Sequence, residues 1–124
     1  MFKKYNDTPA AIAMGLMTLA MIFWTGLLLF SPETLLSDRG IDVSAAPIAR
    51  FVGLTWLGFV VGVIFTFVNG PDGQKVFFNA LLVAHIATAI ANWYEYFAND
   101  VGTLGGDVLI DVVLTALLLF AYFR

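Results

Sequence analysis

The sequence contains no cysteine and few charged residues. The lack of cysteine excludes disulfides, thiolate metal sites and cysteine nucleophiles. Charged residues make up 12% of the 124 residues, whereas about 25% is usual in soluble domains. Only six residues are basic and the formal net charge is −3. Nucleic acid is therefore not an expected partner, because binding it requires a basic surface that neutralises phosphates.

Apolar residues dominate instead, at 60% of the chain, and they gather in long stretches. The stretches cover residues 9–30, 46–68, 75–97 and 107–123. At about 1.5 Å per helical residue, each is long enough for a hydrocarbon core of about 30 Å. In lipid, backbone N–H and C=O groups must form hydrogen bonds with one another, because no water is available, and this favours helices. The sequence therefore predicts an all-α, integral membrane four-helix bundle, with residues 1–124 as a single transmembrane domain.

Turn and capping signals separate these stretches. Thr8-Pro9 is typical of a helix start, and NGPDGQK (69–75) is a turn with two glycines and a proline. Asp107, after Gly105-Gly106, is a candidate N-cap. Between the first two stretches, SPETLLSDRG has a helix start at Ser31-Pro32-Glu33 and a stop at Gly40. We expect a short amphipathic helix over residues 32–39, lying in the membrane interface.

The basic residues predict an orientation. With four spans, both termini and the 69–75 turn share one side, which carries Lys3, Lys4, Lys75 and Arg124. The other side has Arg39 and Arg50. Because lysine and arginine accumulate on the cytoplasmic side, we expect cytoplasmic N- and C-termini in a bacterial inner membrane.

Polar residues inside the spans are the candidate functional residues, because they are costly in lipid and usually face the bundle interior. His85, Thr88, Asn92 and Glu95 follow helical spacing on the third stretch, and Asp107 and Asp111 do so on the fourth. The topology brings Arg50, Glu95, Asp107 and Asp111 to the outer side, where we expect Arg50 to pair with Asp111 or Glu95. This cluster either joins three helices or lines a polar cavity. No nucleophile or metal set accompanies it, so no enzymatic activity is expected.

His85, the only histidine, falls near mid-bilayer and has three interpretations. It bonds a neighbouring helix through Thr18, Thr25 or Thr55. Alternatively, it forms a proton relay with Asn92 and Glu95, or it is the axial ligand of a tetrapyrrole. The candidate ligand-binding residues are His85, Thr88 and Asn92.

Small and flexible residues predict helix packing. Gly58 and Gly62 form a GxxxG pattern with Gly53 nearby, and glycines at this spacing let backbones approach closely. Met14, Met17 and Met21 form a helical stripe that is typical of adaptable core filling.

Several of these segments resemble known families. The SPETLL segment, the A-x-x-x-R-x-x-G run from Ala46 to Gly53 and the acidic start of the last stretch resemble a bacterial family of small four-helix membrane proteins of unknown function, and DoxX-like proteins. Arg50-Phe-Val-Gly53, Trp56, and a histidine followed by a glutamate are similar to an endoplasmic-reticulum scaffold for ergosterol-synthesis enzymes. These resemblances imply an accessory or scaffold role.

Two functions follow as expectations. The first is a non-enzymatic accessory or structural subunit of a larger inner-membrane complex, with other membrane subunits and the lipid bilayer as partners. The second is a carrier that binds a lipid, a quinone or a chlorophyll-type tetrapyrrole through His85 and an outer-leaflet polar cavity. A small transporter is disfavoured, because no broken helix or inverted repeat is apparent.

Overall fold

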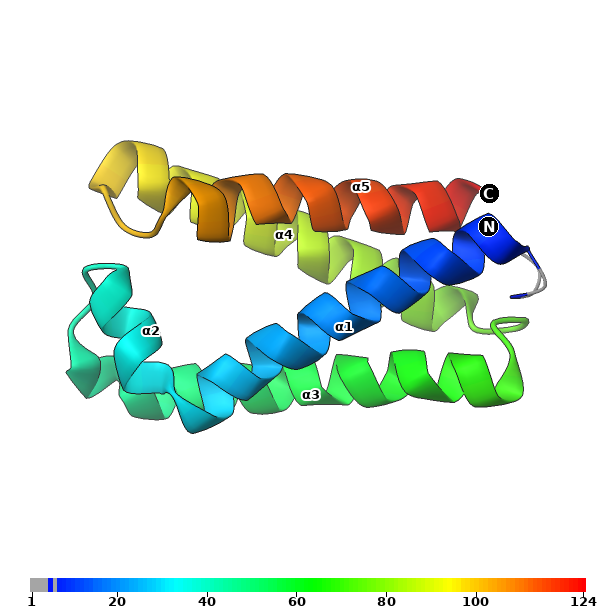
Figure 1. Cartoon of the computed structure of the whole chain (residues 1–124), viewed down its shortest axis with the longest axis horizontal. Coiled ribbons are helices and arrows are strands. Elements are labelled where there is room, and N and C mark those ends of the chain that lie inside the picture. The colour runs from blue at the N-terminus through cyan, green and yellow to red at the C-terminus, as the bar shows by residue number, and fades with distance from the viewer. Residues whose placement is uncertain (1–4, 6) are drawn as a thin grey trace.

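The computed structural model describes residue 5 and residues 7–124, which fold as an all-α bundle (Figure 1). The elements are α1 (Thr8–Phe30), α2 (Pro32–Asp38), a 3₁₀ turn η1 (Val43–Ala45), α3 (Ala46–Asn69), α4 (Lys75–Asn99), a wide π-helical segment η2 (Leu104–Leu109) and α5 (Ile110–Phe123). Within this described part, four helices are long and apolar enough to cross a membrane. The predicted four-helix bundle and its short extra helix are confirmed. Lys3 and Lys4, used to predict the orientation, lie outside the described residues.

The helices cross rather than run parallel. α1 packs on both α3 and α5, and α4 packs on α5. Figure 1 shows α1 running diagonally, from α3 at the end that carries α2 to α5 at the end that carries both termini. At the terminal end, Arg124 Nε lies 3.0 Å from Asp7 Oδ2 and ties the chain ends together. The opposite end is held by α2 and η2, and the candidate site lies there.

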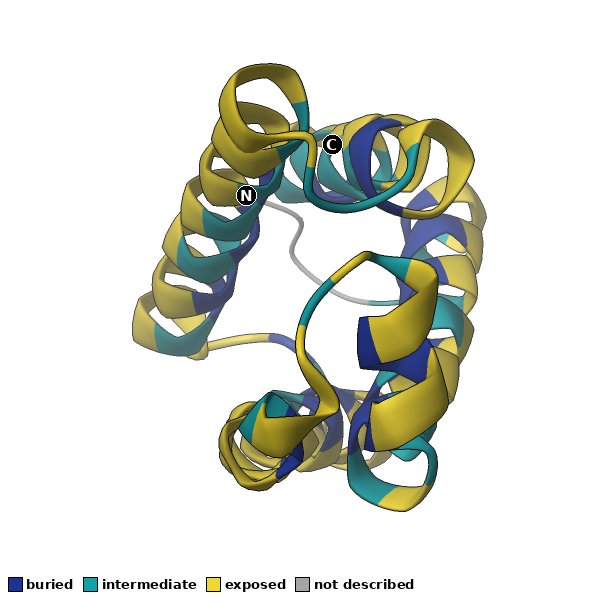
Figure 2. Cartoon of the chain, turned by 90° about the vertical axis from the view of Figure 1, so that its left-hand side faces the viewer, coloured by how far each residue is buried: buried dark blue, intermediate teal, exposed yellow. Residues whose placement is uncertain are grey.

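The core follows the inward faces of the helices. Met14, Met17 and Met21 of α1 are buried with Phe78 and Leu81 of α4, which confirms the predicted methionine stripe. Leu35 and Leu36 of α2 pack on the start of α3. Seen from the end that carries α2, the buried residues line the inside of the ring of helices, and exposed residues cover the outside (Figure 2). Large exposed apolar side chains such as Phe30, Val68 and Val76 give the outward surface that a lipid environment requires.

The three glycines of α3 differ in their surroundings. A Cβ on Gly53 would lie 2.9 Å from Leu28 Cβ, and one on Gly62 would overlap the Phe77 ring, so both allow close packing. A Cβ on Gly58 would meet nothing within 4 Å in the described chain, and Gly58 faces outward. Within the described chain, Gly53 and Gly62 lie in close helix contacts and Gly58 does not.

The last span begins differently from the prediction. Residues 107–123 were expected to form one helix with Asp107 as N-cap, but the helical path starts at Leu104 with η2. Thr103 is the N-cap, and its side chain accepts a hydrogen bond from Gly106 N at 3.0 Å. Asp107 lies one turn further along, where its carboxylate is used for tertiary contacts.

Candidate functional site

A cavity of about 320 Å³ lies inside the bundle toward the end that carries α2 and η2. This volume is at the lower end of the range for small-molecule sites, about 300–1,000 Å³. The wall combines apolar side chains of α1 and α5 with polar groups from α4, α5 and the loop after α2. Its lining residues are Ala20, Met21, Phe23, Trp24, Leu27, Arg39, Trp56, His85, Thr88, Asn92, Gly105, Gly106, Asp107, Ile110, Asp111 and Leu114.

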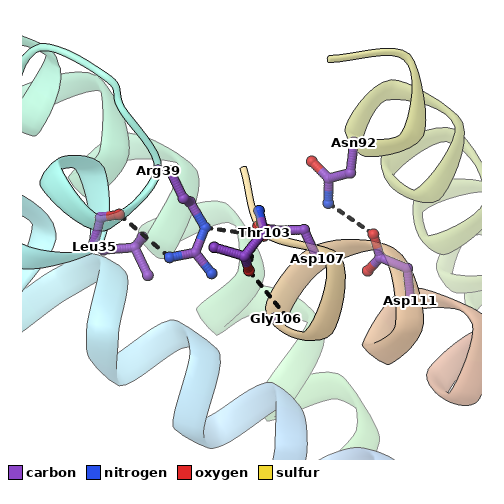
Figure 3. Close-up of polar contacts among 7 residues, drawn as sticks. All are labelled: Leu35, Arg39, Asn92, Thr103, Gly106, Asp107 and Asp111. Carbon is purple, nitrogen blue, oxygen red and sulfur yellow. Dashed lines mark hydrogen bonds and ion pairs between the residues drawn. The ribbon is translucent and has the colours of Figure 1, made fainter. Parts of the chain in front are cut away.

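A largely buried ion pair connects Arg39, the residue after α2, to η2 on the cavity wall (Figure 3). Arg39 Nε donates to Asp107 Oδ1 at 2.9 Å, and Arg39 Nη1 donates to the Leu35 carbonyl at 3.2 Å. The guanidinium also lies over the Trp24 ring, 5.0 Å from its centroid. These contacts compensate the burial of both charged side chains, which are 13% and 6% exposed.

The turn after α4 wraps closely around the Asp107 carboxylate. Asp107 Oδ2 accepts from Thr103 N at 2.7 Å, and Gly102 N donates to the Arg39 carbonyl at 3.3 Å. Gly102 has a φ of +100°, and a Cβ there would lie 3.0 Å from Asp107 Oδ2. Glycine is required at this position by both its φ and its proximity to the carboxylate.

A second polar pair lies deeper along the same wall. Asn92 Nδ2 of α4 donates to Asp111 Oδ2 of α5 at 2.8 Å, as Figure 3 shows. Asp111 is partly buried and lines the cavity. Thr88, one turn from Asn92 on α4, also lines it. The predicted ligand-binding residues His85, Thr88 and Asn92 are therefore on one cavity wall.

His85 is buried at the cavity wall, with 7% of its surface exposed. Its ring contacts the Trp56 indole, with 5.0 Å between centroids. Its Nε2 has no hydrogen-bond partner among the described residues. The predicted bond to a threonine is wrong: Thr18 donates to the Met14 carbonyl, Thr55 donates to the Phe51 carbonyl, and Thr25 Oγ1 has no hydrogen-bond partner among the described residues.

The predicted pairing of Arg50 with Asp111 or Glu95 is also wrong. Arg50 Nη2 donates to Glu33 Oε1 at 2.8 Å, and both side chains are exposed. The reason is the placement of α2, which packs on the start of α3 and brings Glu33 to Arg50. Glu95 faces outward and accepts from Asn99 Nδ2, so it belongs neither to the cavity nor to a relay with His85. Of the predicted cluster, Asp107 and Asp111 come together at the cavity.

Sequence reasoning missed Arg39, Trp24 and Trp56 as site residues. A partial signal for Arg39 was present, because Arg39 and Arg50 were the two basic residues expected on the same side as Asp107. Choosing between them required the position of α2. For the tryptophans we find no such signal, because a span contains many apolar residues and its periodicity does not say which ones border a cavity.

The cavity lining combines groups that can form hydrogen bonds and ion pairs with apolar side chains. It offers two carboxylates, one guanidinium, an imidazole and an amide among mostly apolar residues. Within residue 5 and residues 7–124, no group of three or more His, Cys, Asp or Glu side chains is placed to hold a metal ion. Compared with known proteins, the chain matches no family model, no curated protein and no solved structure. Its resemblance to DoxX-like proteins and to the sterol-enzyme scaffold therefore stays a prediction.

Proposed function

We propose that this chain binds a small amphipathic molecule of the membrane inside the bundle, as a carrier or receptor and not as an enzyme. The observation that carries the proposal is the cavity of about 320 Å³ with His85 on its wall. His85 is 7% exposed, and its Nε2 has no partner in the part of the chain that the structure describes. Because buried polar atoms nearly always have hydrogen-bond partners, a histidine that borders the cavity and lacks such a partner supports a polar occupant close to its ring.

The two walls of the cavity indicate how such a molecule would lie. Its polar part would face Asn92 and Asp111, which already form a hydrogen bond with each other. Its apolar part would contact Met21, Phe23 and Leu27 of α1. A few placed polar groups in a mostly apolar wall are typical of small-molecule sites. Of the ligands expected from the sequence, a quinone or a lipid headgroup suits the cavity volume better than a tetrapyrrole does.

Filling the cavity tests the proposal. Thr88 lines the cavity, whereas the neighbouring Ala87 is exposed on the outside of α4. We expect Thr88→Phe to place its ring in the ligand space and Ala87→Phe to place the same ring in lipid. In native mass spectrometry of the protein gently extracted from its membrane, the wild type and Ala87→Phe should carry one additional non-protein mass. Thr88→Phe should lose it.

Two results of the same experiment would contradict the proposal. Absence of a bound mass from the wild type, or its full retention in Thr88→Phe, would contradict binding in this cavity. Far-ultraviolet circular dichroism of both variants shows whether the helices persist, so that loss of ligand is not confused with loss of fold. His85→Leu provides a second variant, since it removes the unpartnered Nε2 and should weaken retention of the mass in a folded protein.

The role first expected from the sequence, an accessory subunit of a larger inner-membrane complex, stays a prediction. Lipid would cover the outward-facing apolar side chains as well as a partner subunit would, so these side chains do not favour a complex. The same mass spectra test it, because large co-released subunits would support assembly. The placement in a bacterial inner membrane with cytoplasmic termini is proposed on the distribution of lysine and arginine.

A further inference from the structure

Asp111 is a carboxylate at the cavity without a cation beside it. Its Oδ2 accepts from the neutral Asn92 amide at 2.8 Å, and no Lys or Arg of the described residues forms an ion pair with it. The guanidinium on the same wall, Arg39, already bonds Asp107 at 2.9 Å and the Leu35 carbonyl. An acidic group inside a membrane bundle is costly unless it is paired. The cavity therefore provides an acceptor for a positive charge that its described walls do not supply.

Other features of the cavity agree with a cationic occupant. The charged residues on its described walls are Arg39, Asp107 and Asp111, so one negative charge remains after Arg39 and Asp107 pair. The indoles of Trp24 and Trp56 also line the cavity, and the Arg39 guanidinium that lies over the Trp24 ring shows that this wall already accommodates a cation. His85, which is buried and has no hydrogen-bond partner at Nε2 among the described residues, borders the same cavity.

We infer that the cavity selects amphipathic amines in their protonated form, with the Asp111 carboxylate bonding the ammonium group and the apolar wall of α1 contacting the hydrocarbon part. This inference rests on the proposed function and names its ligand class. The amine could belong to a lipid or to a small molecule that partitions into the membrane, because both present the same ammonium group to Asp111.

The test compares an amine with a neutral molecule of the same shape. The probes are 4-phenylbutylamine and 4-phenylbutanol, titrated by calorimetry into the full chain in detergent micelles at pH 7. We expect the wild type to bind the amine and to bind the alcohol more weakly. Asp111→Asn keeps an oxygen that accepts from Asn92 but has no charge, and it should bind the amine about tenfold to a hundredfold more weakly, the range for a hydrogen bond to a charged group. Its affinity for the alcohol should be unchanged.

Glu95→Gln is the matched control, because it removes a carboxylate from the outward face of α4. It should bind the amine as the wild type does, which separates an effect of the site from an effect of total charge. A parallel titration with dodecylamine distinguishes a lipid amine from a small amine as the natural ligand. If dodecylamine binds more tightly than 4-phenylbutylamine, the ligand is a lipid amine; if it binds more weakly, the ligand is a small amine.

The amine inference and the proposed function fail in different ways. Equal affinity for amine and alcohol, unchanged amine binding in Asp111→Asn, or binding of neither probe would overturn the selection of amines. The proposed function would still stand if Thr88→Phe loses the membrane-derived mass that Ala87→Phe retains.

Discussion

Two arginines at the α2 end, Arg39 and Arg50, each pair with a carboxylate, but in different surroundings. Arg39 and Asp107 have side chains that are 13% and 6% exposed, whereas those of Arg50 and Glu33 are 46% and 54% exposed. Removing one partner of a buried pair leaves an uncompensated charge, at a cost of about 3–5 kcal/mol. An exposed pair contributes about 0–1 kcal/mol, because water screens both charges.

We therefore expect Arg39→Leu to reduce the free energy of unfolding by about 3–5 kcal/mol, and Arg50→Leu to reduce it by less than about 1 kcal/mol. Unfolding in mixed micelles with increasing dodecyl sulfate, followed by circular dichroism, measures both. Equal losses in the two variants would contradict the assignment of Arg39 as the buried partner. In the double variant Arg39→Leu/Asp107→Leu, stability should partly recover, since no unpaired charge then remains.

At the scale of the elements, two glycines of α3 can be compared, because one lies in a close helix contact and the other does not. Gly53 lies against Leu28 of α1, whereas Gly58 borders open space in the described structure. We expect Gly53→Ala to cost about 1–3 kcal/mol, because overpacking forces neighbouring atoms to shift. Gly58→Ala should be neutral or slightly stabilising, because alanine favours a helix more than glycine does. The same unfolding experiment measures both, and a larger loss for Gly58→Ala would mean that α3 contacts its neighbours through another face.

The elements were largely predictable, but their contacts were not. Apolar length and backbone satisfaction in lipid predict the spans, and the regular spacing of Met14, Met17 and Met21 predicts the buried face of α1. The same spacing places His85, Thr88 and Asn92 on one face of α4. Which neighbour each face meets depends on the crossing of helices, which periodicity does not encode. Arg50 was consequently assigned to the wrong carboxylate. Glu95, about one helical turn beyond Asn92 on α4, was also misplaced, because it faces outward whereas Asn92 faces Asp111.

For the molecule as a whole, the crossing of α1 separates a packed end of the bundle from an end that contains the cavity. The terminal end is closed by the Asp7–Arg124 pair and by a core that includes Phe78 and Leu81. At the other end, the cavity is bordered by the Arg39–Asp107 pair. The Arg39–Asp107 pair contributes to stability at the cavity end as well, and we expect substitutions of Phe78 or Leu81 in the terminal core to change unfolding without changing the affinity for a molecule added to the cavity.

The orientation of the whole molecule can be tested directly because the chain has no cysteine. Asp38 at the end of α2 and Asp72 in the turn before α4 are exposed and lie at opposite ends of the bundle, as the element labels in Figure 1 show. The bias of lysine and arginine toward the side of the termini predicts that this side is cytoplasmic. In intact bacterial cells, a membrane-impermeant maleimide should therefore label Asp38→Cys, and it should label Asp72→Cys only after permeabilisation. The reverse pattern would place the cavity end on the cytoplasmic side and would contradict the predicted orientation.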